Sequence, residues 1–258
     1  MSQDLFDLSS RTAVVMGGTT GLGQAIALGL AEAGADVVAS ARRKDEIDKV
    51  AAEIEALGRR TIRQASDVLN RPSIQALHDA VVREFGKVDI LVNAVGMTRK
   101  SRTLETDEAD WSKILETNLT GTLRACQIFG KTMVKAGYGR IINIASLSSF
   151  VGFSEVAAYS ASKAAVASLT KVLAIELAQT GVNVNAIAPG VFPTTLNAKL
   201  VQGTARGEEL IQRTPMRRFG LAREVAGPAI FLASEASSFV TGEVIAVDGG
   251  FMASGVNQ

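Results

Sequence analysis

The sequence of 258 residues contains one cysteine, one histidine and five prolines, and each shortage excludes a kind of site or arrangement. The single cysteine, Cys126, cannot form an internal disulfide, which favours a reducing, cytoplasmic location. It lies in an apolar helical pattern that indicates a core position. The single histidine, His78, excludes a His-rich metal site, and we predict no metal. With no Pro/Ser-rich linker and no internal repeat, one domain over residues 1–258 is expected.

The sequence also lacks an excess of charge of either sign and any long apolar run. The 27 lysines and arginines nearly balance the 26 aspartates and glutamates, and the net charge of +1 gives no reason to expect a nucleic-acid partner. No uninterrupted apolar run approaches the roughly 18 residues of a membrane span. The amino-terminal residues MSQDLFDLSS lack the apolar core of a secretory signal. We therefore expect neither nucleic acid nor membrane among the partners.

Short apolar runs alternate with amphipathic segments along the whole chain. The runs predict seven strands, at residues 12–16, 36–40, 61–65, 90–93, 140–144, 183–187 and 244–247. The amphipathic segments predict helices at residues 22–33, 44–57, 72–85, 107–135, 157–180 and 223–233. Strands that alternate with helices of this length indicate an α/β fold, with a doubly wound, mostly parallel seven-stranded sheet and helices on both faces.

Residues Gly17-Gly18-Thr19-Thr20-Gly21-Leu22-Gly23 follow the first strand and precede the first helix. Glycines allow a sharp turn and close approach to a ligand, and a helix N-terminus offers free N–H groups to an anion. A tight turn without a ligand is the simpler alternative. The position directly after the first strand favours a site for the pyrophosphate of a dinucleotide.

Tyr159 and Lys163 lie four residues apart at the start of the helical pattern 157–180, so they share one helix face. A cation about 4 Å from the phenol would lower the pKa of Tyr159 by about 3 units at an effective dielectric near 20. Tyr159 would then act as a general acid or base near neutral pH. For an isolated pair at this spacing, ordinary helix surface is the alternative, so the hypothesis depends on the neighbouring motifs.

The glycine turn and the Tyr159–Lys163 pair resemble those of the short-chain dehydrogenase/reductase family, and the resemblance covers essentially the whole chain. The family's Thr-Gly-x-x-x-Gly-x-Gly motif is matched by Gly17, Gly21 and Gly23, with Met16 in place of the threonine. The resemblance implies a single Rossmann-type domain that binds NAD(P). The change to Met16 removes a hydroxyl that helps to hold the turn.

Further family motifs follow in the expected order. Asp67, followed by Val68, stands where the family's aspartate meets the adenine amino group, and Asn93 and Gly96 match an Asn-Asn-Ala-Gly motif with Ala94 as a variant. Residues 232–234 and 240–250 match the carboxyl-terminal signature. The cofactor-binding set implied by the resemblance is Gly17, Thr19, Gly21, Leu22, Gly23, Ser40, Arg42, Arg43, Asp67, Val68, Asn93, Gly96, Tyr159, Lys163, Pro189, Gly190 and Thr194.

The resemblance also implies the catalytic residues of a ketone reductase or alcohol dehydrogenase. Tyr159 would exchange a proton with the substrate oxygen, and Ser146 would hydrogen-bond that oxygen. Lys163 would bind the nicotinamide ribose and lower the Tyr159 pKa. Asn118 would hold a water that links Lys163 to solvent. A strand-end turn for Ser146 and a helix-surface position for Asn118 are the alternatives that local sequence leaves open.

The end of the second strand predicts the cofactor preference. NAD enzymes place an acidic residue there, which binds the ribose 2′-hydroxyl and repels a 2′-phosphate. Here Ala41 occupies that place, and Arg42 and Arg43 follow, with the Ser40 or Thr19 hydroxyl nearby. We therefore predict NADP(H), with NAD(H) as a possible second cofactor. A solvated helix start is the alternative for both arginines.

The substrate is predicted less directly. Residues 191–218 would form a lid, and residues 213–220 resemble those of gluconate 5-dehydrogenases and 3-oxoacyl-carrier-protein reductases. We favour a sugar acid over a 3-oxoacyl thioester. Arg99, Lys100 and Arg102 would meet an anionic substrate, or form a solvated basic loop. An apolar pocket wall is expected from Phe150, Phe153 and Val156.

A catalytically silent dinucleotide sensor is the alternative function, and the presence of all four catalytic residues favours an enzyme. The family pairs subunits through the helices before Asn143 and after Tyr159, and the small residues of the latter helix fit close contact. A homotetramer is therefore expected.

Overall fold

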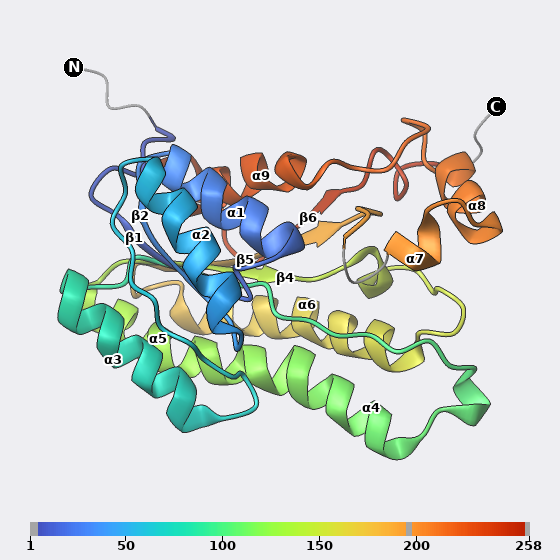
Figure 1. Cartoon of the computed structure of the whole chain (residues 1–258), viewed down its shortest axis with the longest axis horizontal. Coiled ribbons are helices and arrows are strands. Elements are labelled where there is room, and N and C mark those ends of the chain that lie inside the picture. The colour runs from blue at the N-terminus through green and yellow to red at the C-terminus, as the bar shows by residue number, and fades with distance from the viewer. Residues whose placement is uncertain (1–4, 195–197, 256–258) are drawn as a thin grey trace.

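The chain forms a six-stranded parallel sheet between two layers of helices, as the computed structural model of residues 5–194 and 198–255 shows (Figure 1). The strand order is β2-β1-β3-β4-β5-β6, and each neighbouring pair is parallel. This confirms the predicted doubly wound α/β fold. The strands are β1 (Thr12–Met16), β2 (Asp36–Ser40), β3 (Ile90–Asn93), β4 (Gly139–Ile144), β5 (Val182–Pro189) and β6 (Val244–Val247).

Alternate side chains of the strands supply the two cores. In β1, Ala13 and Val15 pack into one cluster, whereas Val14 and Met16 pack into the other. The first cluster joins α1 (Gly21–Glu32), α2 (Lys44–Ala56) and α9 (Ala226–Ala233) to one face of the sheet. The second joins α3 (Arg71–Phe85), α5 (Gly121–Ala136) and α6 (Ala157–Leu177) to the opposite face (Figure 1). Strands buried on both faces explain their nearly continuous apolar sequences.

The predicted seventh strand, residues 61–65, is wrong. This segment runs beside β2, but its described backbone hydrogen bonds to that side are made at the ends, from Val37 N to Arg60 O and from Ser66 N to Ala41 O. Between them, the carbonyl of Gln64 accepts the hydroxyl of Ser40 at 2.7 Å. A side-chain donor thus takes a place that a ladder would give to a backbone N–H, and the segment is extended without being a strand.

The predicted helix 107–135 is divided in the structure. It consists of α4 (Glu108–Leu115), one wide π-helical turn (Glu116–Thr120) and α5. The predicted helix 223–233 begins with a 3₁₀ turn (Ala222–Val225) and continues as α9. Two short helices, α7 (Ala198–Val201) and α8 (Ala205–Arg213), lie beyond the carboxyl ends of the strands (Figure 1). Within the predicted lid, residues 191–218, only residues 195–197 lie outside the described ranges.

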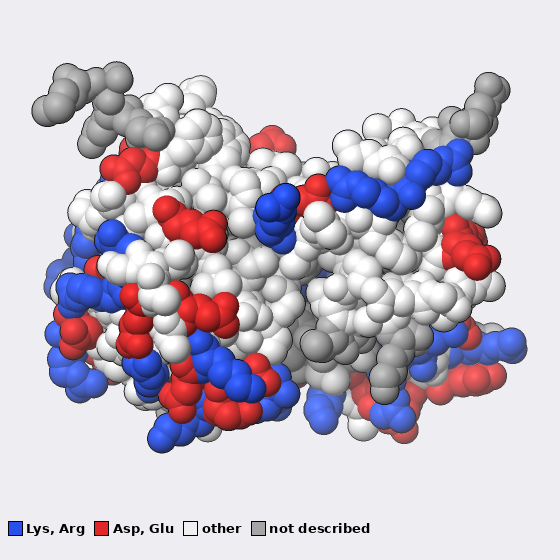
Figure 2. All heavy atoms as spheres, turned by 45° about the horizontal axis from the view of Figure 1, so that its top comes forward, with Lys and Arg blue, Asp and Glu red and all other residues white. Residues whose placement is uncertain are grey.

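None of the described helices is long and apolar enough to cross a membrane. On the face drawn in Figure 2, basic and acidic side chains are interspersed, in keeping with the near-zero net charge of the sequence.

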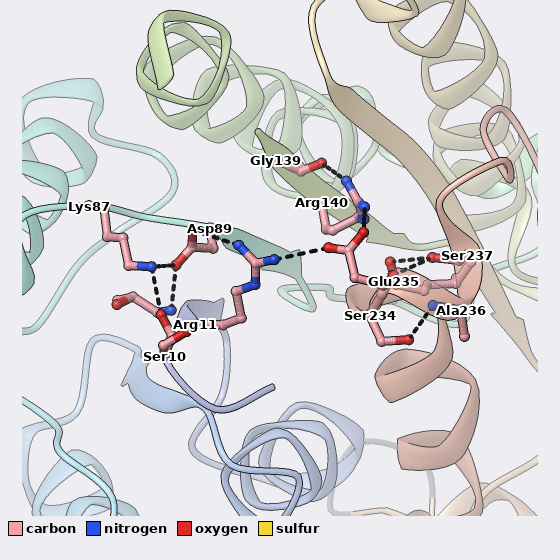
Figure 3. A network of polar contacts seen from close by, with 12 residues as sticks. Ser10, Arg11, Lys87, Asp89, Gly139, Arg140, Ser234, Glu235, Ala236 and Ser237 are labelled. Atoms are coloured by element: carbon pink, nitrogen blue, oxygen red, sulfur yellow. Dashed lines mark hydrogen bonds and ion pairs between the residues drawn. The ribbon is translucent and has the colours of Figure 1, made fainter. Parts of the chain in front are cut away.

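A charged network joins the amino ends of β1, β3 and β4 (Figure 3). Arg11 lies 2.9 Å from Glu235 and 3.7 Å from Asp89. The Glu235 carboxylate also meets Arg140, whose side chain is only 5 % exposed, at 3.4 Å. The two guanidinium groups lie over the Tyr138 ring, at 3.9 and 4.5 Å from its centroid. One carboxylate therefore partners two cations that pack on one aromatic ring.

Replacing Glu235 with alanine should lower the free energy of unfolding by about 1–2 kcal/mol, because the buried guanidinium of Arg140 loses its carboxylate. Denaturant melts would measure the loss. Glu46→Ala is the matched control, since its carboxylate meets only the exposed Arg43 among the described residues. We expect the control to change stability by no more than about 0.5 kcal/mol. Equal losses in the two variants would contradict a special role for the network.

Candidate active site

A cavity of about 760 Å³ opens at the carboxyl ends of the strands. Its walls come from the segments that follow β1, β2, β3, β4 and β5, because parallel strands end at the same edge of the sheet. The order of the strands reverses between β1 and β3, which is where ligands bind in open α/β sheets. Every residue of the predicted cofactor set lines this cavity except Asn93. Of the predicted catalytic residues, Ser146, Tyr159 and Lys163 line it, and Asn118 does not.

The glycine turn forms a close-fitting cradle at the start of α1. Gly17 has a φ of 76°, and a Cβ on it would come within 2.9 Å of the backbone N of Val95. A Cβ on Gly23 would come within 2.1 Å of the Gly17 carbonyl oxygen. Thr20, the residue before the helix, makes no side-chain cap, so the first N–H groups of α1 stay open to a ligand. The turn therefore fits a pyrophosphate group.

Backbone hydrogen bonds hold this turn where the family has a threonine. Gly17 N donates to Ser40 O at 2.7 Å, and Ala94 N donates to Met16 O at 2.9 Å. The Met16 side chain is 1 % exposed and belongs to the core below the turn. The missing hydroxyl is thus replaced by packing from below and by backbone bonds to both neighbouring strands.

The adenosine side of the cavity carries the two predicted arginines. Arg42 and Arg43 are exposed on the rim, and Arg43 lies 3.7 Å from Glu46. Within the described residues Arg42 has no ion-pair partner. The Ser40 hydroxyl, predicted to assist them, is instead committed to Gln64 O at 2.7 Å and to Ser66 Oγ at 2.9 Å. Arg42 is therefore the group best placed to meet a phosphate here.

Asn93 is turned away from the cavity into a buried polar chain, so its predicted contact with the cofactor is wrong for the side chain. Its amide donates to Asn143 Oδ1 at 2.9 Å, and the amide of Asn143 donates to Thr170 at 2.9 Å. Cys126 lies beside the same amide at 3.4 Å, and burial raises the pKa of its thiol to about 12. These hydrogen-bonded side chains link β3, β4 and α6 below the cavity. Cys126 is a core residue, as predicted.

Ser146 and Tyr159 meet in the cavity. Ser146 lies two residues beyond the end of β4 and accepts a hydrogen bond from Ser148 N at 3.1 Å, which fixes the turn that follows. Tyr159 lies in the first turn of α6, and the Ser146 side chain is close enough to lower the pKa of the Tyr159 hydroxyl. The strand-end turn expected as the alternative for Ser146 is therefore present. The same turn places the Ser146 hydroxyl beside Tyr159.

The electrostatics of the Tyr159–Lys163 pair differ from the prediction. The Lys163 ammonium donates to Ile144 O at 2.6 Å and lies 5.8 Å from the centre of the Tyr159 ring. Burial lowers the pKa of Lys163 from 10.5 to about 8. Burial also raises the pKa of Tyr159, and the Ser146 side chain opposes that rise. The expected lowering by Lys163 is therefore wrong for this arrangement, because desolvation dominates for both groups.

Asn118 lies in the π-helical turn and is completely buried, so the surface alternative is wrong. Its side-chain oxygen accepts from Met97 N at 2.8 Å, while its amide donates to Met97 O at 3.0 Å and to Ser162 at 2.9 Å. Asn118 thus connects the segment after β3 to α6. The contact on α6 is Ser162, which directly precedes Lys163. Its predicted role in holding a water stays a prediction.

The predicted substrate contacts are mostly engaged elsewhere. Arg99 pairs with Asp110 at 2.8 Å and Lys100 pairs with Glu155 at 2.8 Å, so the solvated-loop alternative fits them better. Phe153 packs on Phe251 with ring centres 6.0 Å apart. Neither Phe153 nor Phe150 and Val156 is among the residues that line the cavity. Lining residues that the sequence did not single out include Leu69, Met97, Lys113, Thr117 and Phe192, and several of them directly adjoin a recognised motif.

Comparisons with known proteins agree with this site. The family model described as "Enoyl-(Acyl carrier protein) reductase" matches residues 17–252. The 2-dehydro-3-deoxy-D-gluconate 5-dehydrogenase of Dickeya dadantii is 42% identical over 256 residues, which cover 98% of this chain and 100% of the relative. A gluconate 5-dehydrogenase from Burkholderia cenocepacia, solved with NADP and tartrate, is similar with a TM-score of 0.94 and 37% identity, over 97% of this chain and 98% of that one.

A short-chain type dehydrogenase/reductase from Mycobacterium marinum shares the fold as well, with a TM-score of 0.92 and 37% identity over 97% of this chain and 99% of that one. The residues matched by the family model, 17–252, span the cavity-lining segments from the glycine turn to α6. The chain therefore belongs to the short-chain dehydrogenase/reductase family.

Proposed function

We propose that the protein is an NADP(H)-dependent oxidoreductase that interconverts a secondary alcohol and a ketone of a sugar acid. The observation that carries the proposal is the meeting of Ser146, Tyr159 and Lys163 with the glycine turn in one cavity. The names of the relatives supply the substrate class. One acts on 2-dehydro-3-deoxy-D-gluconate and another on gluconate, and the solved gluconate 5-dehydrogenase contains NADP.

The residues of the cavity fit the cofactor. When bound, its nicotinamide ring carries the hydride, which no side chain can supply. The turn at Gly17 to Gly23 and the start of α1 would hold the pyrophosphate, Asp67 would meet the adenine, and Arg42 would meet the 2′-phosphate. Lys163 would hold the ribose hydroxyls. These assignments rest on the cradle at the glycine turn and on Arg42, which has no ion-pair partner among the residues that the structure describes.

Proton transfer would be the task of Tyr159. In reduction its hydroxyl gives a proton to the carbonyl oxygen, and in oxidation its phenolate takes one from the alcohol. Ser146 donates a hydrogen bond to the same oxygen, where negative charge develops. Both residues line the cavity, and the effect of Ser146 on the pKa of Tyr159 supports this pairing.

A homotetramer, a cytoplasmic location and a single domain over the chain remain predictions. Val172 and Ile175 on α6 are 49% and 79% exposed, which supports self-association along that helix.

A spectrophotometric panel tests the substrate class. D-gluconate and 2-dehydro-3-deoxy-D-gluconate would be offered with NADP⁺, and a 3-oxoacyl thioester with NADPH, while the absorbance of reduced nicotinamide is followed. Turnover of a sugar acid supports the proposal. Preference for the thioester favours an acyl-carrier-protein reductase instead. Tight cofactor binding with no turnover in a broad panel favours a sensor.

Tyr159→Phe should reduce the rate by about 10²- to 10⁴-fold with little change in cofactor affinity, because the ring still packs but the exchangeable proton is gone. Tyr138→Phe is the control, since the only other tyrosine of the chain lies in the charged network away from the cavity. Initial rates and cofactor titrations of the three proteins measure both effects. A Tyr159 variant that keeps more than about a tenth of the rate would exclude the assignment.

Ala41→Asp combined with Arg42→Ala should move the preference from NADP(H) towards NAD(H). The change adds the carboxylate that repels a 2′-phosphate and removes a charged hydrogen bond, for a shift of about ten- to hundredfold. The ratio of kcat/KM for the two cofactors measures it. Arg43→Ala serves as the control and should shift the ratio less, because Arg43 is shared with Glu46. A wild-type protein that favours NAD(H) would contradict the prediction.

The buried Lys163 predicts a pH-dependent stability in the cofactor-free protein. Its folded pKa, about 8, lies below its ordinary value of 10.5, so the buried charge destabilises the fold fully below about pH 8, and the penalty is relieved as the pH rises towards 10.5. The difference between these two pKa values corresponds to a penalty of about 3 kcal/mol. A substitution that removes the ammonium recovers less than this, because it also loses the hydrogen bond to Ile144 O.

Lys163→Met should therefore be more stable than the wild type near pH 7, and this advantage should shrink between about pH 8 and pH 10.5. Thermal melts across that range measure it. Lys171→Met, at an exposed position of the same helix, should show no such trend. An advantage that is constant with pH would mean that Lys163 does not titrate in this range.

A further inference from the structure

Glu155, four residues before Tyr159, has a φ of 67°. This is the left-handed region, which glutamate adopts only where the surroundings over-determine it. Residues held in this way are concentrated at functional sites. The position is one at which a glycine would be free of strain, so the glutamate side chain itself needs an explanation.

The carboxylate of Glu155 meets cations from two separate parts of the chain. Lys100, from the segment after β3, lies 2.8 Å away, and Arg206, from the lid helix α8, lies 3.9 Å away. Arg206 also donates to the carbonyl of the preceding Ser154 at 3.3 Å. The hydrogen bond from Lys100 lowers the pKa of the Glu155 carboxyl, with Arg206 adding to the effect, so the group is ionised at neutral pH.

The backbone around Glu155 is fixed by the same neighbours. Ser101 N donates to Glu155 O at 2.8 Å, and Ser101 forms an isolated parallel bridge with Val156. Val156 precedes α6 and provides no side-chain cap. The first turn of α6, which carries Tyr159, is therefore positioned by contacts with the segment after β3 and with α8, and not by a cap of its own.

Apolar packing joins the same three parts. Phe153 packs with Phe251, and both belong to a cluster with Leu147 from the turn after Ser146 and Leu210 from α8. The ion pairs of Glu155 add to this packing, and the side chains of Glu155 and Arg206 are about a third exposed, at 31% and 30%. Charge and packing thus bind α8 to residues 153–156 at two adjacent places.

From these contacts we infer that Glu155 is a positioning residue, which couples the docking of the lid helix α8 to the placement of Tyr159. Its carboxylate pairs with Lys100 and with Arg206, which come from different segments. The left-handed backbone at Glu155 places the carboxylate between these two cations. Loosening the pairs would release α8 and relax the first turn of α6 in one event. The inference about turnover rests on the proposed function, whereas the coupling to α8 does not.

Hydrogen exchange of the cofactor-free protein tests the coupling without any substrate. Glu155→Gln should speed exchange of the amides at residues 205–213 by about two- to fivefold, the range expected for partly exposed ion pairs. Glu208→Gln is the matched control, because Glu208 is an exposed glutamate of α8 itself. Equal exchange in wild type and Glu155→Gln, or an equal increase in the control, would overturn the inference.

Glu155→Gly separates the strained backbone from the carboxylate. Glycine removes the strain, so the melting temperature should stay equal or rise, yet α8 should exchange as fast as in Glu155→Gln. If the glycine variant instead exchanges as slowly as the wild type, the carboxylate is not what holds the helix, and the inference fails.

Steady-state kinetics with 2-dehydro-3-deoxy-D-gluconate and NADP⁺ test the second half. Glu155→Gln and Arg206→Met should each raise KM for the sugar acid, again by about two- to fivefold, with the cofactor dissociation constant unchanged. The double variant should be no worse than the poorer single one, because both remove the same contact. Additive effects would refute the coupling. Absence of turnover in the wild type would refute only the proposed substrate.

Discussion

Because all six strands are parallel, their carboxyl ends open on one edge of the sheet, and the segments that leave them begin around the same cavity. The chain passes from β1 to β2 on one side and returns to β3 on the other, so the segments after β1 and β3 separate and leave room for a ligand. The glycine turn, Ser146 and Pro189 reach this cavity by topology alone. Tyr159 and Lys163 reach the cavity from a helix, α6, and their positions therefore depend on how α6 packs on the sheet.

The placement of α6 depends on buried polar contacts. Asn143 in β4 accepts from Asn93 in β3 and donates to Thr170 in α6, and all three side chains are almost completely buried. Lys163 adds a bond from α6 to the carbonyl of Ile144 in β4. Buried polar groups are costly unless satisfied, so a shift of α6 along β4 would leave several unpaired at once. The network therefore fixes the register of the helix that carries the tyrosine.

The sequence predicted the fold and most of the site because its motifs are local. Gly17, Ser146 and the Tyr159–Lys163 pair are recognisable from their neighbours, and all of them line the cavity. The failures concern side-chain direction. Asn93 faces the core because Asn143 lies beside it in the next strand, and the Ser40 hydroxyl is taken by a carbonyl 24 residues further along the chain. No spacing rule reveals such partners, because they are fixed only when distant segments pack.

The same limit explains the error about Lys163. Spacing along a helix places a cation near a phenol, and a Coulomb estimate then favours the phenolate. The fold also buries both groups, which their spacing along the helix does not reveal, and burial disfavours the charged form of each one. It raises the pKa of Tyr159 and brings that of Lys163 to about 8. With a pKa of about 8, Lys163 is still mostly protonated at neutral pH, but it loses its proton at a lower pH than a surface lysine does. Burial thus moves both groups towards their neutral forms, and helix spacing alone does not reveal this.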